Sequence, residues 1–200
     1  MLTLGVTGGI GSGKTAFVAR LAEHPGVRVL LADALAKRLM VEDPEVRRQL
    51  VDRFGTEAYH EDGSLNRQAI AARVFGDETE LAALNAIVHP AVRRAMLEAM
   101  EQARIDGVEL LVYEAALIFE TNADQILDHV AVVDAPIETR IARAMARDGS
   151  TREQVEARMT RQLAPAELRR RADTVIDNDG SMEELHALAD GLLASLARAD

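Results

Sequence analysis

The hydrophobic positions of this 200-residue chain fall into five short runs, at residues 2–6, 27–31, 108–113, 129–133 and 174–176. The runs are rich in Val, Leu and Ile, which is typical of strands buried on both faces. Between them the spacing of hydrophobic and polar positions is helical, for example over residues 16–22 and 34–40. This alternation predicts an α/β protein: a mostly parallel five-stranded sheet with helices on both faces.

Two long segments leave this regular alternation. The first, between the second and third runs, contains helical patterns at residues 44–53, 66–75, 78–87 and 90–104, with turn residues at 61–64. The second covers residues 149–171, between the fourth and fifth runs. We therefore expect a single domain with a core at about 1–43, 107–148 and 172–200, an inserted helical subdomain at about 44–106, and a lid at about 149–171.

A glycine-rich segment follows the first predicted strand and precedes the first predicted helix. It reads Gly8-Gly9-Ile10-Gly11-Ser12-Gly13-Lys14-Thr15. In this context such a loop binds the phosphates of a nucleoside triphosphate through its backbone amides and the amino end of the helix. A strand-to-helix turn without function is the alternative, but eight matching residues in the right context favour nucleotide binding.

Two side chains of this loop carry specific chemistry. Lys14 is expected to reach the outer phosphates, and the Thr15 hydroxyl is expected to ligate Mg²⁺ bound with ATP. The chain has 21 arginines but only two lysines, Lys14 and Lys37. Although the chain uses arginine almost everywhere else, the loop contains lysine, whose compact ammonium fits between phosphate oxygens.

Composition and charge narrow the possible functions. The formal net charge of −10 argues against a nucleic acid partner, and the absence of cysteine excludes disulfides and thiol nucleophiles. No hydrophobic run is long enough to span a bilayer, and no signal peptide is visible, so we expect a cytoplasmic protein. Residues 137–171 contain nine arginines and five acidic residues, which would suit a lid that binds phosphate.

Two acidic residues are candidates for catalysis or metal binding next to the phosphates. Asp33 follows the second predicted strand and could accept the proton of an attacking hydroxyl; it could equally be the N-cap of the next helix. Glu114 ends the third predicted strand, where it could orient magnesium or its water, or simply be solvated. Glu120, six residues further on, is left without an assignment.

Three arginines follow Pro136 at helical spacing: Arg140, Arg143 and Arg147 lie at i, i+3 and i+7, on one face. Such a face is usually solvated. Because the residues after it are also rich in arginine, we expect at least one arginine of this region to contact the transferring phosphoryl group. A loop for ATP, a carboxylate at a strand end and an arginine-rich lid favour a kinase over a nucleotide-dependent switch or motor.

Over essentially its whole length, the chain resembles bacterial dephospho-coenzyme A kinases. The resemblance is carried in order by Thr7 to Thr15; Ala32-Asp33; Asp62-Gly63-Ser64-Leu65; Leu84-Asn85-Ala86-Ile87-Val88-His89-Pro90; Leu117-Ile118-Phe119-Glu120; Arg147-Asp148-Gly149; Arg161-Gln162; and Ala172-Asp173-Thr174-Val175-Ile176-Asp177-Asn178-Asp179-Gly180. The block with His89-Pro90 and the block ending in Asn178 are the most specific.

The resemblance implies ATP-dependent phosphorylation of the ribose 3'-hydroxyl of dephospho-coenzyme A, the last step of coenzyme A synthesis. It implies that Asp33 is the general base and binds the acceptor, and that Lys14 and Arg140 stabilise the transferring phosphoryl. Residues 44–106 would bind the coenzyme A moiety, with His89 among the contacts. Arg147 and Asn178 would join the loop residues Gly9, Ile10, Gly11, Ser12, Gly13, Lys14 and Thr15 in binding ATP.

The chain departs from the family's pattern at a few positions. Leu31 stands where an aspartate is common, Glu114 where aspartate is usual and Ala116 where proline is usual. These differences concern local geometry at the strand ends rather than the reaction. A nucleoside monophosphate kinase or another small-metabolite kinase is the alternative, because such enzymes share the loop, the lid and an inserted acceptor domain.

Overall fold

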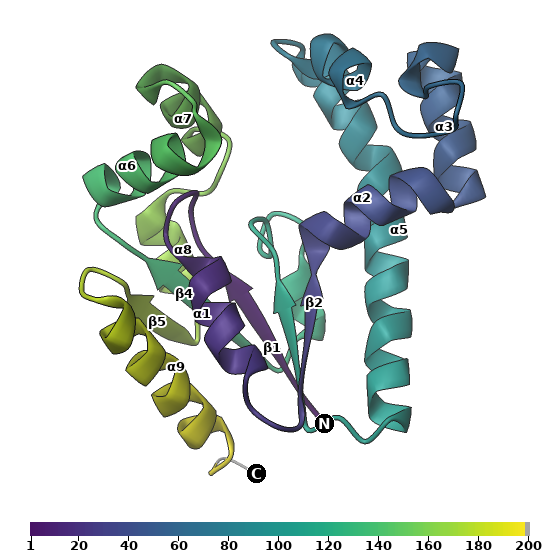
Figure 1. The fold of residues 1–200 in the computed structure, drawn as a ribbon. Coiled ribbons are helices and arrows are strands. Elements are labelled where there is room, and N and C mark those ends of the chain that lie inside the picture. The colour runs from purple at the N-terminus through teal and green to yellow at the C-terminus, as the bar shows by residue number, and fades with distance from the viewer. Residues whose placement is uncertain (199–200) are drawn as a thin grey trace. The chain divides into compact units, whose positions relative to one another are not determined.

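The computed structural model describes residues 1–198. Its sheet has the strand order β2-β3-β1-β4-β5, formed by β1 (Leu2–Thr7), β2 (Val27–Leu31), β3 (Leu110–Glu114), β4 (His129–Asp134) and β5 (Thr174–Asp177). β1 pairs in parallel with β3 and β4, and β4 pairs in parallel with β5. The predicted five-stranded α/β sheet is therefore confirmed. Figure 1 shows the strand that carries the phosphate loop, β1, in the middle of the sheet.

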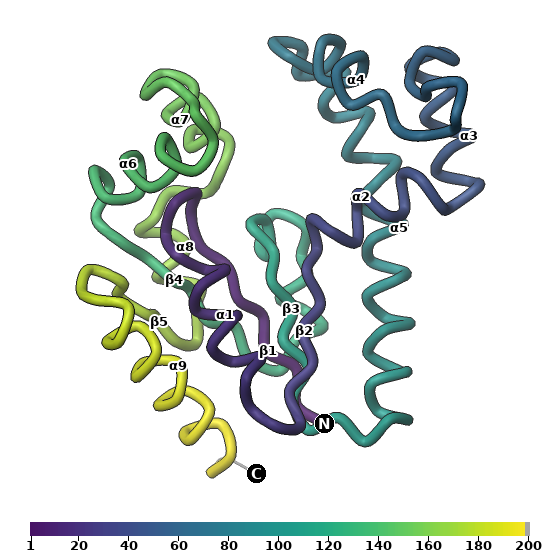
Figure 2. The backbone as a smooth tube through the Cα atoms, viewed as in Figure 1, coloured from purple at the N-terminus to yellow at the C-terminus, as the bar shows by residue number. Residues whose placement is uncertain are grey.

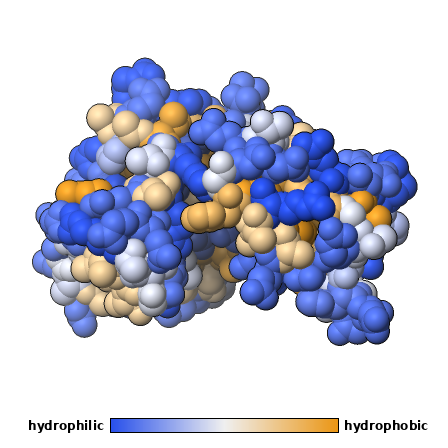
Figure 3. Space-filling view, turned by 90° about the horizontal axis from the view of Figure 1, so that it is seen from above, coloured by the Kyte–Doolittle hydropathy of each residue, from blue (hydrophilic) through white to orange (hydrophobic). Residues whose placement is uncertain are grey.

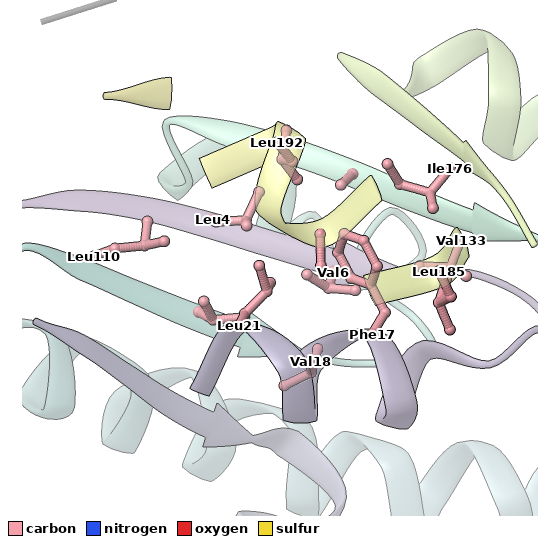
Figure 4. Close-up of a cluster of buried hydrophobic side chains, with 13 residues drawn as sticks. Leu4, Val6, Phe17, Val18, Leu21, Leu110, Val133, Ile176, Leu185 and Leu192 are labelled. Carbon is pink, nitrogen blue, oxygen red and sulfur yellow. The ribbon is translucent and has the colours of Figure 1, made fainter. Parts of the chain in front are cut away.

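Two helices cover one face of this sheet: α1 (Lys14–Ala22) and α9 (Met182–Leu196), which also pack against each other. Leu4 and Val6 of β1 point into a cluster with Phe17 of α1 and Leu185 of α9, all nearly inaccessible to solvent (Figure 4). Burying a side chain of this size contributes roughly 1.5 to 3 kcal/mol. The cluster fixes the helix whose first residue is Lys14.

The other face is covered by the segment after β3 and by α8 (Pro165–Arg171), which contacts β4. Strand alternation turns Gly5 toward this face, where Ile118 and Leu127 lie against it. The segment includes the short 3₁₀ helix η2 (Ala123–Ile126). Close packing on this face therefore leaves no space for a Cβ atom at position 5 of β1.

Two further helices lie between β4 and α8 in the sequence. They are α6 (Ile137–Asp148) and α7 (Arg152–Met159), and α7 begins with a capping box made by Thr151 and Gln154. Val155 of α7 is fully buried against Ile141 and Ala144 of α6. The segment predicted as a lid thus contains α7 and α8, and its α7 packs on α6 through a small hydrophobic cluster.

Residues 31–101 form a second compact unit. It contains α2 (Ala32–Glu42), α3 (Pro44–Phe54), the 3₁₀ helix η1 (Thr56–Ala58), α4 (Arg67–Val74) and the greater part of α5 (Glu78–Ile105). Its hydrophobic core joins Leu50 and Phe54 of α3 to Ile70 of α4 and Ala91 of α5. The expected turn at residues 61–64 is present, with Asp62 accepting hydrogen bonds from the backbone amide and hydroxyl of Ser64.

The prediction of two helices at residues 78–87 and 90–104 is wrong, because α5 runs without interruption from Glu78 to Ile105. Pro90 lies inside it. Proline removes one backbone hydrogen bond and usually costs about 3 kcal/mol in a helix interior. Here Val88, Ala91 and Met96 are buried around it, and this burial holds the helix together across the proline.

The face of the molecule displayed in Figure 3 is predominantly hydrophilic. Figure 3 shows hydrophobic residues as small patches separated by hydrophilic ones on the face it displays. Among residues 1–198, no helix combines the length and the hydrophobicity needed to cross a membrane.

Candidate nucleotide-binding site

The glycine loop connects the end of β1 to the beginning of α1 at the carboxyl edge of the sheet (Figure 2). Gly13 is the N-cap residue of α1 and has a left-handed backbone with φ 99°. Gly8 and Gly11 also have positive φ, and a Cβ on either would collide with a backbone carbonyl, of Val133 and of Arg140 respectively. The loop therefore needs glycine for conformation and for space at these positions.

Lys14 and Thr15 open α1 and place their polar groups at the loop. Lys14 Nζ donates to the carbonyl oxygens of Gly8 (2.8 Å) and Gly9 (3.2 Å). Thr15 Oγ1, which is exposed, donates to Glu114 Oε1 at 3.2 Å. The ammonium, the hydroxyl and the carboxylate that were predicted separately are thus brought to one edge of the sheet.

Arg140 is buried beneath the loop, with only 4% of its surface exposed. Its Nε donates to the carbonyl oxygen of Ile10 at 3.1 Å, and its Nη1 lies 3.9 Å from Asp134 Oδ1. Burial lowers the pKa of the Arg140 guanidinium from its ordinary value, and the nearby carboxylate of Asp134 partly offsets that effect. Arg140 accordingly brings a fixed positive charge to the underside of the phosphate loop.

Asn178 supports the loop from a different strand. It follows β5, is buried, and donates from Nδ2 to the carbonyl oxygen of Ser12 at 2.8 Å. Arg143 Nη1 in turn donates to the carbonyl oxygen of Asn178 at 3.5 Å. The side chain of Asn178 is therefore engaged with the loop itself, and a direct contact with the nucleotide stays a prediction.

The arginines predicted on one face of α6 differ in their surroundings. Arg140 is buried and Arg143 half-buried, whereas Arg147 is exposed and forms an ion pair with Asp148 at 2.7 Å. Arg158 also contacts Asp148, and the two guanidinium groups hold the pKa of that carboxyl well below its usual range. The role of Arg147 in ATP binding stays a prediction.

Most arginines of the lid segment are likewise paired with carboxylates. Arg152 pairs with Glu138 and Glu156, Arg169 with Asp134 and Asp177, Arg170 with Glu167, and Arg171 with Asp124. Within residues 1–198, Arg161 is the lid arginine that has no such partner, and it is exposed. Its charge is the one in the lid that a phosphate could take up without breaking an existing ion pair.

Sequence reasoning missed two residues that hold the connection between α7 and α8. Gln162 Oε1 accepts a 2.9 Å hydrogen bond from the backbone amide of Ile10, and Glu120 Oε1 accepts one of 3.0 Å from the amide of Leu163. Gln162 was noticed only as part of the Arg161-Gln162 pair, and Glu120 had no assigned role. Both contacts link segments far apart in the chain, which hydrophobic spacing cannot reveal.

Asp33 and His89 belong to the second unit. Asp33 is exposed and lies in the first turn of α2, whose N-cap is Leu31. The interpretation of Asp33 as a helix cap is therefore wrong, because α2 has no side-chain cap hydrogen bond. His89 is half-buried in α5, and desolvation lowers the pKa of its imidazole. Their proposed contacts with an acceptor stay predictions.

The oxygen groups at the loop fit a magnesium ion that arrives with a nucleotide. Thr15 and Glu114 supply a hydroxyl and a carboxylate, both hard donors, within 3.2 Å of each other. No cluster of three or more acidic, histidine or cysteine side chains that could hold a metal occurs among residues 1–198. Magnesium in phosphate-transfer sites is usually held by one or two protein oxygens together with phosphates and water.

The parallel sheet and the glycine loop, whose carbonyl oxygens accept hydrogen bonds from Lys14 and Arg140, define a P-loop nucleotide-binding protein. A family model for dephospho-CoA kinase matches residues 2–184. The chain belongs to the dephospho-CoA kinase family.

Individual relatives agree with this assignment. A dephospho-CoA kinase of Salinibacter ruber is 52% identical over 185 residues, which are 92% of this chain and 92% of that protein. The crystal structure of TT1252 from Thermus thermophilus is 38% identical and has a TM-score of 0.77, covering 98% of this chain and 97% of the other. A dephospho-CoA kinase from Campylobacter jejuni, at 24% identity and a TM-score of 0.73 over 98% of each chain, supports the fold.

Proposed function

We propose that this protein transfers the γ-phosphoryl group of ATP to the ribose 3'-hydroxyl of dephospho-coenzyme A, giving coenzyme A and ADP as the last step of coenzyme A biosynthesis. Membership of the dephospho-CoA kinase family supports the proposal. The observation that carries the chemistry is the position of Lys14 Nζ, 2.8 Å from the carbonyl oxygen of Gly8 at the mouth of a loop of backbone amides. A cation fixed there neutralises charge on the outer phosphates.

The other site residues have defined tasks in this proposal. Backbone amides of the glycine loop hold the phosphates, and Arg140 keeps a positive charge under the loop. Asp33 accepts the proton of the ribose hydroxyl and orients it, which fits its exposed carboxylate. The unit formed by residues 31–101 holds the coenzyme A moiety, with His89 among its contacts.

We also propose that Mg²⁺ accompanies ATP. Thr15 Oγ1 would ligate the ion and Glu114 would hold one of its water molecules. When bound, the ion would draw negative charge from the β- and γ-phosphate oxygens. A cytoplasmic location, expected from the sequence, stays a prediction.

A coupled assay for ADP release tests the proposed reaction. The purified protein is given ATP and Mg²⁺ with dephospho-coenzyme A, with a panel of nucleoside monophosphates, or with no acceptor, and the product is located by NMR. We expect ADP release to depend on dephospho-coenzyme A and the new phosphate to be on the 3' oxygen. Equal turnover with a nucleoside monophosphate would favour the alternative kinase, and acceptor-independent hydrolysis would favour a switch.

A further inference from the structure

Ile10 of the phosphate loop contacts the lid segment through its backbone and through its side chain. Its backbone amide donates to Gln162 Oε1 at 2.9 Å, and its side chain packs against the cluster that contains Val155 of α7. Met159, also of α7, packs against the same cluster. In Figure 2 the loop between β1 and α1 runs beside the chain that connects α7 to α8.

The connection between α7 and α8 is held from the core as well. Leu163, the residue after Gln162, donates from its amide to Glu120 Oε1 at 3.0 Å. Two consecutive residues of the connection are therefore bonded to two different parts of the core. This fixes where the carboxamide of Gln162 can lie.

The position of Ile10 identifies which phosphate is near. Lys14 Nζ rests on the carbonyl oxygens of Gly8 and Gly9, and the lysine of such a loop contacts the outer phosphates. Ile10 is the next residue, and its carbonyl oxygen accepts a hydrogen bond from Arg140. Gln162 is thus bound to the end of the loop that faces the outermost phosphate.

We propose that Gln162 binds the terminal phosphate of ATP and couples it to the position of the lid. Oε1 keeps its hydrogen bond with the Ile10 amide, while Nε2, attached to the same carbon, donates to a γ-phosphate oxygen. Within residues 1–198, Nε2 makes no hydrogen bond of its own, so the donor is available. The proposal rests on the proposed function only in that ATP is the phosphate donor.

Gln162→Glu is the decisive variant. Glutamate can still accept from the Ile10 amide, but it cannot donate and it carries a negative charge. Affinities for ATP and ADP are measured with Mg²⁺ and without acceptor, by displacement of a fluorescent ADP analogue. We expect the dissociation constant of ATP to rise at least about tenfold, the size expected for a hydrogen bond to a charged group, while that of ADP stays within about threefold. An unchanged ratio of the two affinities would overturn the proposal.

Further variants separate binding from placement of the lid. Gln162→Met keeps the length of the side chain but loses both polar atoms, so it should also lose preference for ATP; unaltered preference would contradict the proposal. Glu120→Ala removes the second anchor without touching the loop and should alter ATP and ADP binding equally. If Glu120→Ala lowers the preference for ATP as much as Gln162→Glu does, Gln162 acts only through the lid. Because no acceptor is present, these results are independent of which metabolite is phosphorylated.

Discussion

Asn178 Nδ2 lies 2.8 Å from the carbonyl oxygen of Ser12, and both residues are buried. The backbone amide of Asn178 donates in turn to the carbonyl oxygen of Asp134 at 2.7 Å, at the end of β4. A residue after the last strand therefore holds the carbonyl that precedes the N-cap of α1. The conformation of the phosphate loop depends on this neighbour as much as on its own glycines.

Lys14→Ala should lower kcat by at least about 10²- to 10³-fold, the cost of removing one preorganised charge-stabilising group. The fold should persist, because the ammonium donates to carbonyl oxygens of the loop and lies outside the hydrophobic core. Circular dichroism and turnover are measured on the same sample. Lys37, the other lysine of the chain, is exposed in α2. Lys37→Ala is therefore the matched control and should keep full activity. Activity of Lys14→Ala within tenfold of the parent would refute the role.

Asp33→Asn should lower kcat by about 10²- to 10⁴-fold and leave ATP affinity unchanged, as expected when a general base is lost. Melting temperature should barely change, because Asp33 makes no cap hydrogen bond in α2. The lower end of the range is expected, since the hydroxyl proton leaves late in loose phosphoryl transfer.

Asp43→Ala provides the contrast for Asp33. Asp43 is the N-cap of α3 and accepts from the amides of Glu45 and Val46, so its loss should cost about 0.5 to 2 kcal/mol of stability. It should leave kcat nearly unchanged. A near-normal kcat for Asp33→Asn would leave Asp33 without a catalytic task.

Arg140→Lys should be the most damaging of the three lysine substitutions in α6, with kcat reduced by more than about tenfold. A lysine cannot reproduce the hydrogen bond from Nε to Ile10 while filling the space beneath Gly9. Arg147→Lys should be mild, because Arg147 is exposed. The order is checked by measuring kcat and melting temperature for Arg140→Lys, Arg143→Lys and Arg147→Lys. The prediction would be wrong if Arg140→Lys were the least damaged of the three.

Residues 149–163 should exchange amide hydrogens faster without nucleotide than with ATP and Mg²⁺. A small hydrophobic cluster around Val155 and two ion pairs, Arg152 with Glu138 and Arg158 with Asp148, attach α7 to α6. Ion pairs at the surface contribute little to stability, so this segment can open at low cost and is expected to close over the phosphates. Peptides from α9 serve as the internal control. Equal protection of residues 149–163 in both states would argue against a lid.

His89 should make stability depend on pH. Burial keeps its pKa below the value of about 6.5 of an unfolded chain, so the unfolded state binds more protons as pH falls. Stability is therefore highest above about pH 6.5, declines below it, and levels off once the pH is under the folded pKa. When the pH is lowered from about 8 to about 5, the melting temperature of His89→Gln should fall less than that of the parent. His60→Gln, at an exposed position, should follow the parent; identical slopes for all three would contradict the assignment.

The strands and the phosphate loop could be predicted because their determinants are local. A run such as Leu110-Leu111-Val112-Tyr113 is hydrophobic along its whole length only if both faces are covered, and β3 is buried over those residues. The chemistry of Gly8 to Thr15 likewise depends on neighbouring positions. Tertiary burial overrode the local preference at Pro90, where the sequence indicated a break and the helix continues.

The support of the site could not be predicted, because it is made of contacts between distant segments. Arg140 was expected to face the nucleotide, yet nothing in its spacing indicated that its guanidinium would be buried against Ile10. The contacts of Asn178 with Ser12 and of Gln162 with Ile10 span more than 150 residues each. Only the resemblance to known kinases drew attention to Asn178 and Gln162.

The same long-range contacts constrain when the site can form during protein synthesis. The phosphate loop leaves the ribosome well before the residues that hold its backbone, Arg140, Gln162 and Asn178, which lie 130 to 166 residues further along the chain than their partners in the loop. A nascent chain therefore lacks a finished pocket for nucleotide until β5 has been made and has paired with β4. Cellular ATP can then stabilise the completed protein by binding it, but it cannot guide the early stages of folding.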